Sequence, residues 1–267
     1  MTTLSIAVTG ANGGIGRAIC QALAEDGHRL HLIGRQSEAL EALRTSLKNT
    51  AQHHCWQADL SDVRSIDALA DAMLGTGVAL DVLINNAGCS QFATLDDSEP
   101  DALAMMLKVN TLAPMLLSRR LLPTLLRSEH ATLINVGSSF GSIGYPGFSG
   151  YCASKFALRG FTEALQRELA DREIAIHYLA PRAVATDINS EAVVAMNAEL
   201  GNAVDKPAVV ADALQALLHQ RRSQNRYLGW PERLFVRLNA LLPTLVTGSL
   251  RKQLPRILYY ARRGGDS

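Results

Sequence analysis

The sequence predicts one α/β domain built around a parallel β-sheet, followed by a helical C-terminal extension. Short apolar runs alternate with amphipathic stretches along most of the chain, a pattern typical of successive β-α-β units. A glycine-rich turn separates the first apolar run from the first amphipathic stretch. Of the 267 residues, 48% are hydrophobic and 19% charged. This composition can form one sizeable core and excludes a disordered chain.

The apolar runs predict the strands, and the stretches between them predict helices. Strands are expected at residues 4–9, 30–33, 53–58, 80–85, 132–136 and 174–179. Helices are expected over 14–26 and 151–172, and Ser37 and Ser61 are each placed to cap another helix. Ser98-Glu-Pro-Asp101 indicates the start of a further helix, with the serine as its N-cap and the proline in its first turn. Without repeats or linkers before about residue 220, we expect a domain over 1–229 and the extension over 230–267.

Charge and cysteine content exclude several classes of function. The net charge of +1 argues against a nucleic-acid partner, which requires many phosphates to be neutralised. Cys20, Cys55, Cys89 and Cys152 form no C-x-x-C pair, so neither a metal site nor a dense disulfide framework is expected. No basic leader precedes an apolar stretch, and no apolar run is long enough to span a bilayer. We therefore expect a cytoplasmic protein.

The first strand is followed by Thr9-Gly-Ala-Asn-Gly-Gly-Ile-Gly16, which indicates a phosphate-binding turn. Backbone N–H groups of such a turn can approach a pyrophosphate held at a helix N-terminus. The glycines at 10, 14 and 16 do not fit the common G-x-G-x-x-G spacing. Taken alone, the turn is also consistent with a tight strand-to-helix connection that binds no ligand.

Three further motifs extend this pattern: Asn85-Asn-Ala-Gly88 after the fourth strand, Tyr151-Cys-Ala-Ser-Lys155, and Ser138 thirteen residues before the tyrosine. In this order, and with the glycine-rich turn, they resemble the short-chain dehydrogenase/reductase family over about residues 4–229. The resemblance implies a single doubly wound Rossmann fold and a homo-oligomer. It also implies reversible hydride transfer between a nicotinamide cofactor and an alcohol or carbonyl.

The resemblance assigns a cofactor site to this chain, mostly at the ends of successive strands. Its members are Gly10, Asn12, Gly14, Ile15, Gly16, Arg35, Asp59, Leu60, Asn86, Ala87, Gly88, Tyr151, Lys155, Pro181 and Thr186. An NAD-preferring protein would usually carry an acid at the end of the second strand, where Gly34 and Arg35 stand. Because an arginine favours a 2′-phosphate, we expect NADP(H). The alternative is that Arg35 simply faces solvent.

The candidate catalytic residues are Asn110, Ser138, Tyr151 and Lys155. Tyr151 and Lys155 share one helix face, where the lysine charge can lower the tyrosine pKa from about 10. Tyr151 would act as general acid toward a carbonyl oxygen, to which Ser138 would also donate a hydrogen bond. The resemblance places Lys155 on the nicotinamide ribose as well, and matches Asn110 to an asparagine that holds a proton-relay water.

Each of these residues also has a purely structural alternative. Tyr151 and Lys155 can be ordinary helix residues, and Ser139 competes with Ser138 as the polar residue at the strand end. Asn110 alone fits a helix surface or a kink before Pro114. The polar residues at strand ends can bond to nearby backbone or cap a helix; these are Asn85, Asn86 and Asp59.

The chain departs from the family after the sixth strand, where Pro181-Arg182 replaces the usual Pro-Gly pair. The loss of the glycine removes freedom for positive φ and introduces a long cation. Arg182 either contacts an anionic group of a ligand or projects outward. Residues 187–206 follow, in the place of the family's substrate lid. Their apolar side chains indicate a hydrophobic substrate or a helix packed on the core: Ala192, Val193, Val194, Met196 and Leu200.

The C-terminal extension is strongly basic. Residues 221–267 hold ten Lys and Arg against two acids, a net charge of +8, and residues 1–220 carry −7. Pro231, Pro243 and Pro255 are each suited to the first turn of a short helix. The first helix has an apolar stripe flanked by Arg233 and Arg237; it consists of Leu234, Phe235, Leu238, Leu241 and Leu242.

Two interpretations of this stripe stay open. It can close an apolar cleft and secondarily contact anionic lipid at a membrane surface. Alternatively it packs on the protein's own cleft or on a partner subunit and leaves the arginines solvated.

Together these features predict an NADP(H)-dependent oxidoreductase that acts on a small apolar or lipid-like carbonyl or alcohol. A cofactor-binding regulatory or scaffold protein without turnover is the alternative. The set formed by Ser138, Tyr151 and Lys155 argues against it, because a pure binding protein has no chemical need for these residues.

Overall fold

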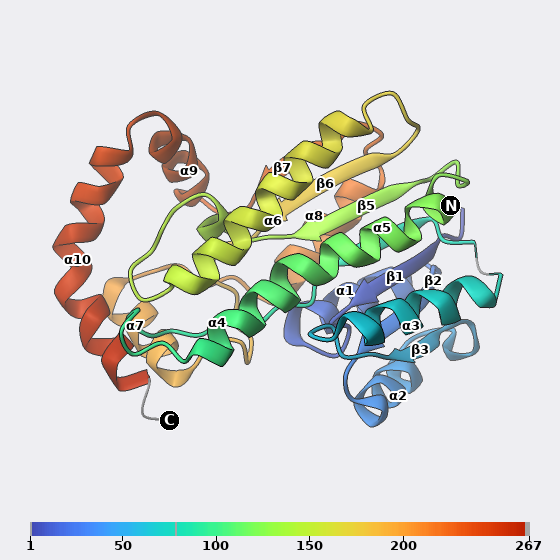
Figure 1. Ribbon diagram of the computed structural model, residues 1–267, viewed down its shortest axis with the longest axis horizontal. Helices are drawn as coiled ribbons and strands as arrows, with labels where there is room; N and C mark the ends of the chain where they lie inside the picture. The colour runs from blue at the N-terminus through green and yellow to red at the C-terminus, as the bar shows by residue number, and fades with distance from the viewer. Residues whose placement is uncertain (1, 78, 265–267) are drawn as a thin grey trace.

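Seven parallel strands form one twisted sheet with helices on both faces (Figure 1). The computed structural model describes residues 2–77 and 79–264. The strand order is β3-β2-β1-β4-β5-β6-β7. The strands are β1 (Ser5–Thr9), β2 (Arg29–Gly34), β3 (His54–Gln57), β4 (Val82–Asn85), β5 (Thr132–Val136), β6 (Ala175–Ala180) and β7 (Gln224–Tyr227). This doubly wound order confirms the predicted fold class.

Two apolar layers hold the helices on the sheet. On one face, α1 (Gly14–Glu25), α2 (Ser37–Ser46) and α8 (Pro207–Leu218) pack against side chains such as Ile6, Leu32 and Ile84. On the other face lie α3 (Val63–Gly75), α5 (Ala113–Leu125) and α6 (Ser149–Glu168). Because the five inner strands are buried on both sides, they are nearly continuous apolar runs in sequence.

The six predicted strands are present, with ends within two residues of the expected positions. The seventh strand, β7, was not predicted. Its sequence is Gln-Asn-Arg-Tyr, it lies at the edge of the sheet, and all four residues are half-buried. A polar edge strand contains neither the apolar run nor the alternation from which strands are predicted.

The three serine caps that we predicted are wrong by one position. Ser37 is the first residue of α2, and the Asp62 side chain, not Ser61, caps α3 by accepting from the N–H of Arg64 at 3.1 Å. Helix α4 (Pro100–Leu107) follows Glu99, and the Ser98 hydroxyl donates to the backbone of the preceding turn.

A π-helical turn, Lys108–Leu112, joins α4 to α5 in one continuous helix. Pro114 has no N–H to donate to the carbonyl of Asn110, four residues earlier, so the regular hydrogen-bond ladder is interrupted here. The turn rotates Asn110 inward, where its side chain is fully buried. The helix-surface alternative for Asn110 is therefore wrong, and a π-helical turn stands where the other alternative placed a kink.

The extension forms two helices instead of the three that we predicted. They are α9 (Glu232–Leu241) and α10 (Pro243–Gly264), and Pro255 lies inside α10. Both Pro255 and Arg251 are exposed. Proline has no N–H that could donate to the carbonyl of Arg251, and this carbonyl is therefore open to water. Asp266, one of the two acids counted above, lies outside the described residues.

Helix α10 is held by an apolar cluster at one end of the molecule (Figure 1). Ile257 and Ala261 of α10 are fully buried there, together with Val193 and Met196 of α7 (Glu191–Leu200). The predicted lid segment thus contains a helix packed beneath the extension. Within residues 2–77 and 79–264, no helix is both long and apolar enough to cross a membrane.

Candidate active site

A cavity of about 920 Å³ opens at the carboxyl ends of the parallel strands. Its walls come from the glycine-rich turn, the loops after β2 to β6, helix α7 and the C-terminal extension. The strand order reverses between β1 and β4, the position at which open α/β sheets form ligand crevices. Every residue of the predicted cofactor site lines this cavity, and so does Ser138. Asn110 does not.

Close contacts leave no room for side chains on the glycine-rich turn. Gly10 has a φ of +63°, and a Cβ there would lie 2.9 Å from the Cα of Ala87. A Cβ on Gly16 would lie 2.1 Å from the carbonyl oxygen of Gly10, and one on Gly14 would lie 2.5 Å from Thr186. The bare turn places the N-terminus of α1, with its unpaired N–H groups, against the cavity.

Thr9, which we did not predict as a site residue, fixes the motif after β4. Its hydroxyl oxygen accepts from the N–H groups of Asn86 at 2.9 Å and of Ala87 at 3.0 Å. The Asn86 amide in turn donates to the carbonyls of Thr9 and Gly10. The Asn86 side chain therefore bonds to strand-end backbone. Asn85 is buried and donates to Asn135 at 2.8 Å, a structural contact within the sheet.

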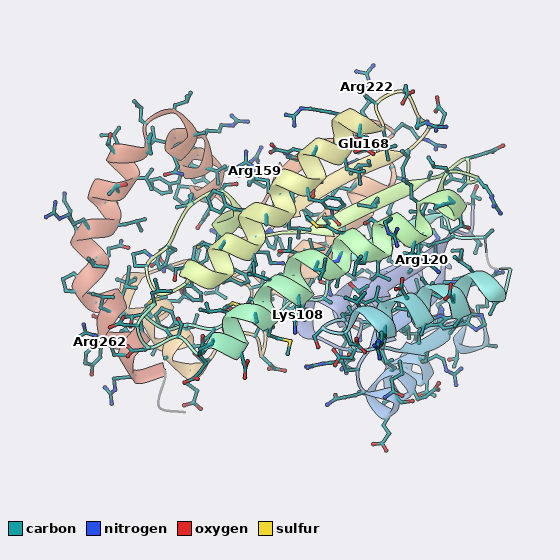
Figure 2. All side chains as sticks on the ribbon, in the orientation of Figure 1. Lys108, Arg120, Arg159, Glu168, Arg222 and Arg262 are labelled. Atoms are coloured by element: carbon teal, nitrogen blue, oxygen red, sulfur yellow. The ribbon has the colours of Figure 1, made fainter. Side chains whose placement is uncertain are left out.

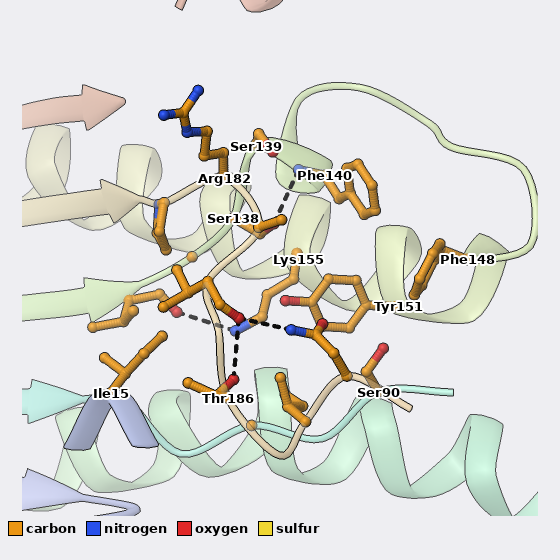
Figure 3. Close-up of a pocket in the computed structure, with 18 of the residues that line it drawn as sticks. Ile15, Ser90, Ser138, Ser139, Phe140, Phe148, Tyr151, Lys155, Arg182 and Thr186 are labelled. Carbon is orange, nitrogen blue, oxygen red and sulfur yellow. Dashed lines mark hydrogen bonds between the residues drawn. The ribbon is translucent and has the colours of Figure 1, made fainter. Parts of the chain in front are cut away.

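Ser138, Tyr151 and Lys155 converge in the cavity (Figure 3). Helix α6 places the tyrosine and the lysine one turn apart, and the Lys155 Nζ lies 5.8 Å from the Tyr151 ring centroid. The same Nζ donates to the carbonyl of Val136 at 3.0 Å. The backbone of Ser138 is held on both sides by the hydroxyl of Tyr178, a fully buried residue.

Burial changes the pKa of both ionisable groups of this set. It raises the pKa of Tyr151 to about 12, while the neighbouring Ser138 hydroxyl acts in the opposite direction. It lowers the pKa of Lys155 to about 8. We expected the lysine to depress the tyrosine pKa. In the protein alone, desolvation has the largest effect on the Tyr151 pKa and keeps the residue protonated at neutral pH.

Asn110 lies behind the cavity wall and ties two segments together. Its amide donates to the carbonyl of Cys89 at 2.9 Å and to the Ser154 hydroxyl at 2.9 Å, and its oxygen accepts from the N–H of Cys89 at 2.8 Å. A Cβ on Gly88 would lie 3.2 Å from the Asn110 oxygen and 3.6 Å from the Lys155 Nζ. The glycine thus keeps a narrow gap between these two side chains.

Arg35 and Asp59 stand at the other end of the cavity, after β2 and β3. The Arg35 side chain is exposed at the cavity wall. The Asp59 carboxylate accepts from the backbone N–H and the hydroxyl of Ser61, and these hydrogen bonds lower its pKa. Asp59 therefore both lines the cavity and orders the loop before α3.

Arg182 neither projects outward nor leaves its guanidinium free for an anionic group of a ligand. Its guanidinium forms a bidentate pair with Asp205, at 2.8 and 3.0 Å, and a second pair with Glu232 at 3.2 Å. It also donates to the carbonyl of Trp230. Its φ is not positive, so no glycine is required at this position. Arg182 joins the end of β6 to the loop before α8 and to the start of α9.

The extension supplies apolar side chains to the cavity wall. Phe235 and Leu238 come from α9, and Leu245, Val246 and Leu250 come from α10. The sequence predicted that the α9 stripe would close a cleft. For the helix expected to begin at Pro243 the sequence gave no such indication, since an apolar stripe was identified only in the first helix of the extension.

Comparison with known proteins places these features in one family. Residues 5–197 match the family model described as short chain dehydrogenase. The dehydrogenase/reductase SDR family member 7B of Xenopus tropicalis is 29% identical over 253 residues, covering 90% of this chain and 82% of that protein. Carbonyl reductase family member 4 of Danio rerio is 32% identical over 221 residues, covering 82% of this chain and 92% of that protein.

Solved structures agree with this result. A short-chain dehydrogenase from Streptomyces avermitilis superposes with a TM-score of 0.80 at 26% identity, covering 95% of this chain and 97% of that one. The alcohol dehydrogenase of Thermococcus sibiricus, complexed with 5-hydroxy-NADP, gives a TM-score of 0.74 at 25% identity. It covers 85% of this chain and 96% of that one.

Arg182→Ala tests whether this arginine anchors the extension. We expect the free energy of unfolding to fall by about 1–3 kcal/mol, because two largely buried carboxylates lose their counter-charge. Arg256→Ala, which breaks an exposed pair with Glu199, should cost less than about 0.5 kcal/mol. Urea denaturation measures both values, and equal losses would contradict the anchoring role.

Lys155→Met tests the buried ammonium through pH. Folding lowers the pKa of Lys155 from 10.5 to about 8, so its charge disfavours folding fully below pH 8 and progressively less up to pH 10.5. The free energy of unfolding of the variant minus that of the wild type should therefore decrease across this window. The lost bond to Val136 shifts the difference by a constant. Denaturation at a series of pH values measures it, and a flat difference would refute the assignment.

Proposed function

The chain belongs to the short-chain dehydrogenase/reductase family of oxidoreductases, and we propose that it uses NADP(H) to interconvert a carbonyl and an alcohol on a small apolar or lipid-like substrate. The observation that carries this proposal is the convergence of Ser138, Tyr151 and Lys155 in a cavity that also receives the N-terminus of α1. A cavity that only held a dinucleotide would not need a proton donor beside a buried lysine.

The residues at the first βα turn fit a dinucleotide. A Cβ at Gly10, Gly14 or Gly16 would meet other atoms within 3 Å, so the turn presents bare backbone to the cavity. The helix N-terminus behind it favours the negative charge of a pyrophosphate. Tyr151 and Lys155 would hold the nicotinamide ribose at the opposite end. Bound NADPH supplies the hydride that reduces the carbonyl carbon.

In the reducing direction, Tyr151 donates its proton to the carbonyl oxygen. Its high pKa keeps the proton available at neutral pH, and the Ser138 hydroxyl stabilises the charge that develops on the same oxygen. The Lys155 ammonium, 5.8 Å from the tyrosine ring, favours the tyrosinate that remains. In the oxidising direction the same tyrosinate accepts the alcohol proton.

Arg35 supports a preference for NADP(H). It directly follows β2, at the position where an acid would bind a ribose 2′-hydroxyl. Its guanidinium has no ion-pair partner in the part of the chain that the structure describes. It is therefore available for a 2′-phosphate at the cavity edge.

The walls on the catalytic side support an apolar substrate. Phe140 stacks on Tyr145 with ring centroids 4.8 Å apart, and Phe148 packs against both rings. The apolar side chains of α9 and α10 line the same cavity. Such surroundings favour a hydrocarbon body with the reacting oxygen at its polar end.

Tyr151→Phe removes the proton donor and little else. We expect kcat to fall by about 10²- to 10⁴-fold with NADPH affinity within a few-fold of the wild type, because general acid catalysis is worth about this much. Tyr145→Phe, which removes a hydroxyl from another tyrosine of the same cavity, is the matched control and should keep most activity. Steady-state kinetics and cofactor fluorescence measure both, and undiminished turnover in Tyr151→Phe would refute the mechanism.

Arg35→Ala tests the cofactor preference. The variant should bind NADPH roughly tenfold to a hundredfold more weakly, because one charge-assisted hydrogen-bond donor is lost. NADH, which lacks the 2′-phosphate, serves as the internal control and should lose little affinity. Cofactor titrations measure both constants, and equal weakening would show that Arg35 does not read the 2′-phosphate.

A further inference from the structure

Helix α9 and the turn into α10 present an apolar surface to solvent. We call this surface the hairpin face; it consists of Leu234, Leu241, Leu242 and Leu245. Leu241 is 79% exposed and Leu245 is 58% exposed. Single exposed leucines are ordinary, but four on one short hairpin form a patch of the kind that marks an interaction site.

The orientation of α9 directs this face outward. Val236 is buried, and the Asn239 amide donates to the carbonyl of Ser142 at 2.9 Å, so these residues define the inner side of the helix. Leu234 and Leu241 are seven residues apart and lie on the outer side. The extension stands at one end of the molecule, with no other element beyond it among the described residues (Figure 1).

The charges around the hairpin face are almost all positive. Residues 230–252, from α9 to the first half of α10, carry four Lys and Arg against one acid, Glu232, which is paired with Arg182. Arg233 and Arg237 are exposed along the edge of the α9 stripe. Arg251 and Lys252 are exposed on α10. An apolar strip edged by cations complements a surface that is anionic outside and apolar beneath.

The cavity reaches the same side of the extension. Leu245 belongs to the hairpin face and also lines the cavity. Phe235, which is 39% exposed, and Leu238 line the cavity as well. The apolar wall of the cavity is thus continuous with the exposed apolar surface. A molecule held at the hairpin face would lie next to the cavity entrance.

We propose that the hairpin face docks this protein on an anionic lipid membrane, with the leucines at the acyl-chain boundary and the arginines on lipid phosphates. A second copy of the chain docking through the same face would bring two strongly positive surfaces together, which disfavours self-association. Docking itself does not depend on turnover. Its consequence, entry of an apolar substrate from the lipid, rests on the proposed function.

Vesicle co-sedimentation of the full chain tests the proposal. Wild-type protein should bind vesicles of phosphatidylcholine containing phosphatidylglycerol, bind phosphatidylcholine alone far more weakly, and dissociate as salt is raised. Arg233→Gln/Arg237→Gln should weaken binding on the order of 30-fold, the effect of two surface charges. Leu241→Glu/Leu242→Glu should weaken it at least as much. Neither variant alters a residue that lines the cavity.

Matched controls carry the same changes on surfaces away from the hairpin face. Arg64→Gln/Arg222→Gln removes two exposed arginines, of which Arg222 lies far from α10 (Figure 2), and Val63→Glu/Leu74→Glu alters two exposed side chains of α3. Both should bind vesicles like the wild type. No binding to anionic vesicles at low salt, or equal losses in controls and hairpin variants, would overturn the proposal.

Sedimentation velocity without lipid completes the test. A lower oligomeric state in Leu241→Glu/Leu242→Glu, with vesicle binding unchanged, would identify a protein interface and overturn the proposal. Turnover of a small water-soluble carbonyl should stay within twofold in every variant. Vesicle binding by a protein that proves inactive would uphold the docking while refuting the proposed function, so the two failures are distinguishable.

Discussion

Three chain segments meet at the carboxyl edge of the sheet with no space for a side chain between them. The turn after β1 touches the start of the loop after β4 through Gly10 and Ala87, and the loop after β6 through Gly14 and Thr186. A side chain at Gly10 or Gly14 would meet these neighbours at 2.9 Å or less, so it would push the segments apart and widen the cavity floor. The position of every other wall follows from this contact, because β1 and β4 are the central strands on which the outer ones are built.

A buried tyrosine has a comparable role on the catalytic side. The backbone from Gly137 to Gly141 passes around the Tyr178 ring so closely that a Cβ on either glycine would lie within 2.2 Å of it. The Tyr178 hydroxyl then bonds the peptide groups of Ser138 from both directions. Ser138 is therefore positioned both by a phenol ring in the core of the sheet and by its loop neighbours, since its hydroxyl accepts from the N–H of Phe140 at 3.1 Å and its carbonyl from the N–H of Gly141 at 2.9 Å.

Short segments of the sequence predicted those features that depend on interactions within the same segment. Buried parallel strands are apolar on both faces, so the inner strands β1, β2, β4, β5 and β6 could be found; of the two polar edge strands, β3 was predicted and β7 was not. Ser138, Tyr151 and Lys155 could be selected as candidates because the spacing on α6 and the place after β5 depend on short segments, whereas Asn110 lies behind the cavity wall. The partners of Arg182 are 23 and 50 residues away, and nothing in the sequence indicated that they would meet. Pro255 was wrongly interpreted as the start of a third helix, because a helix tolerates a proline where water can hydrogen-bond to the freed carbonyl.

The Arg182 cluster also determines how this chain can be recombined with its relatives. The cation follows β6, and the carboxylates of Asp205 and Glu232 belong to the loop before α8 and to the extension. A chimera that received only the C-terminal helices would leave one of these charges without its counterpart in a poorly solvated position. The extension therefore cannot be transferred to a relative on its own. Its exchange between homologues must include the residue after Pro181 as part of the same unit.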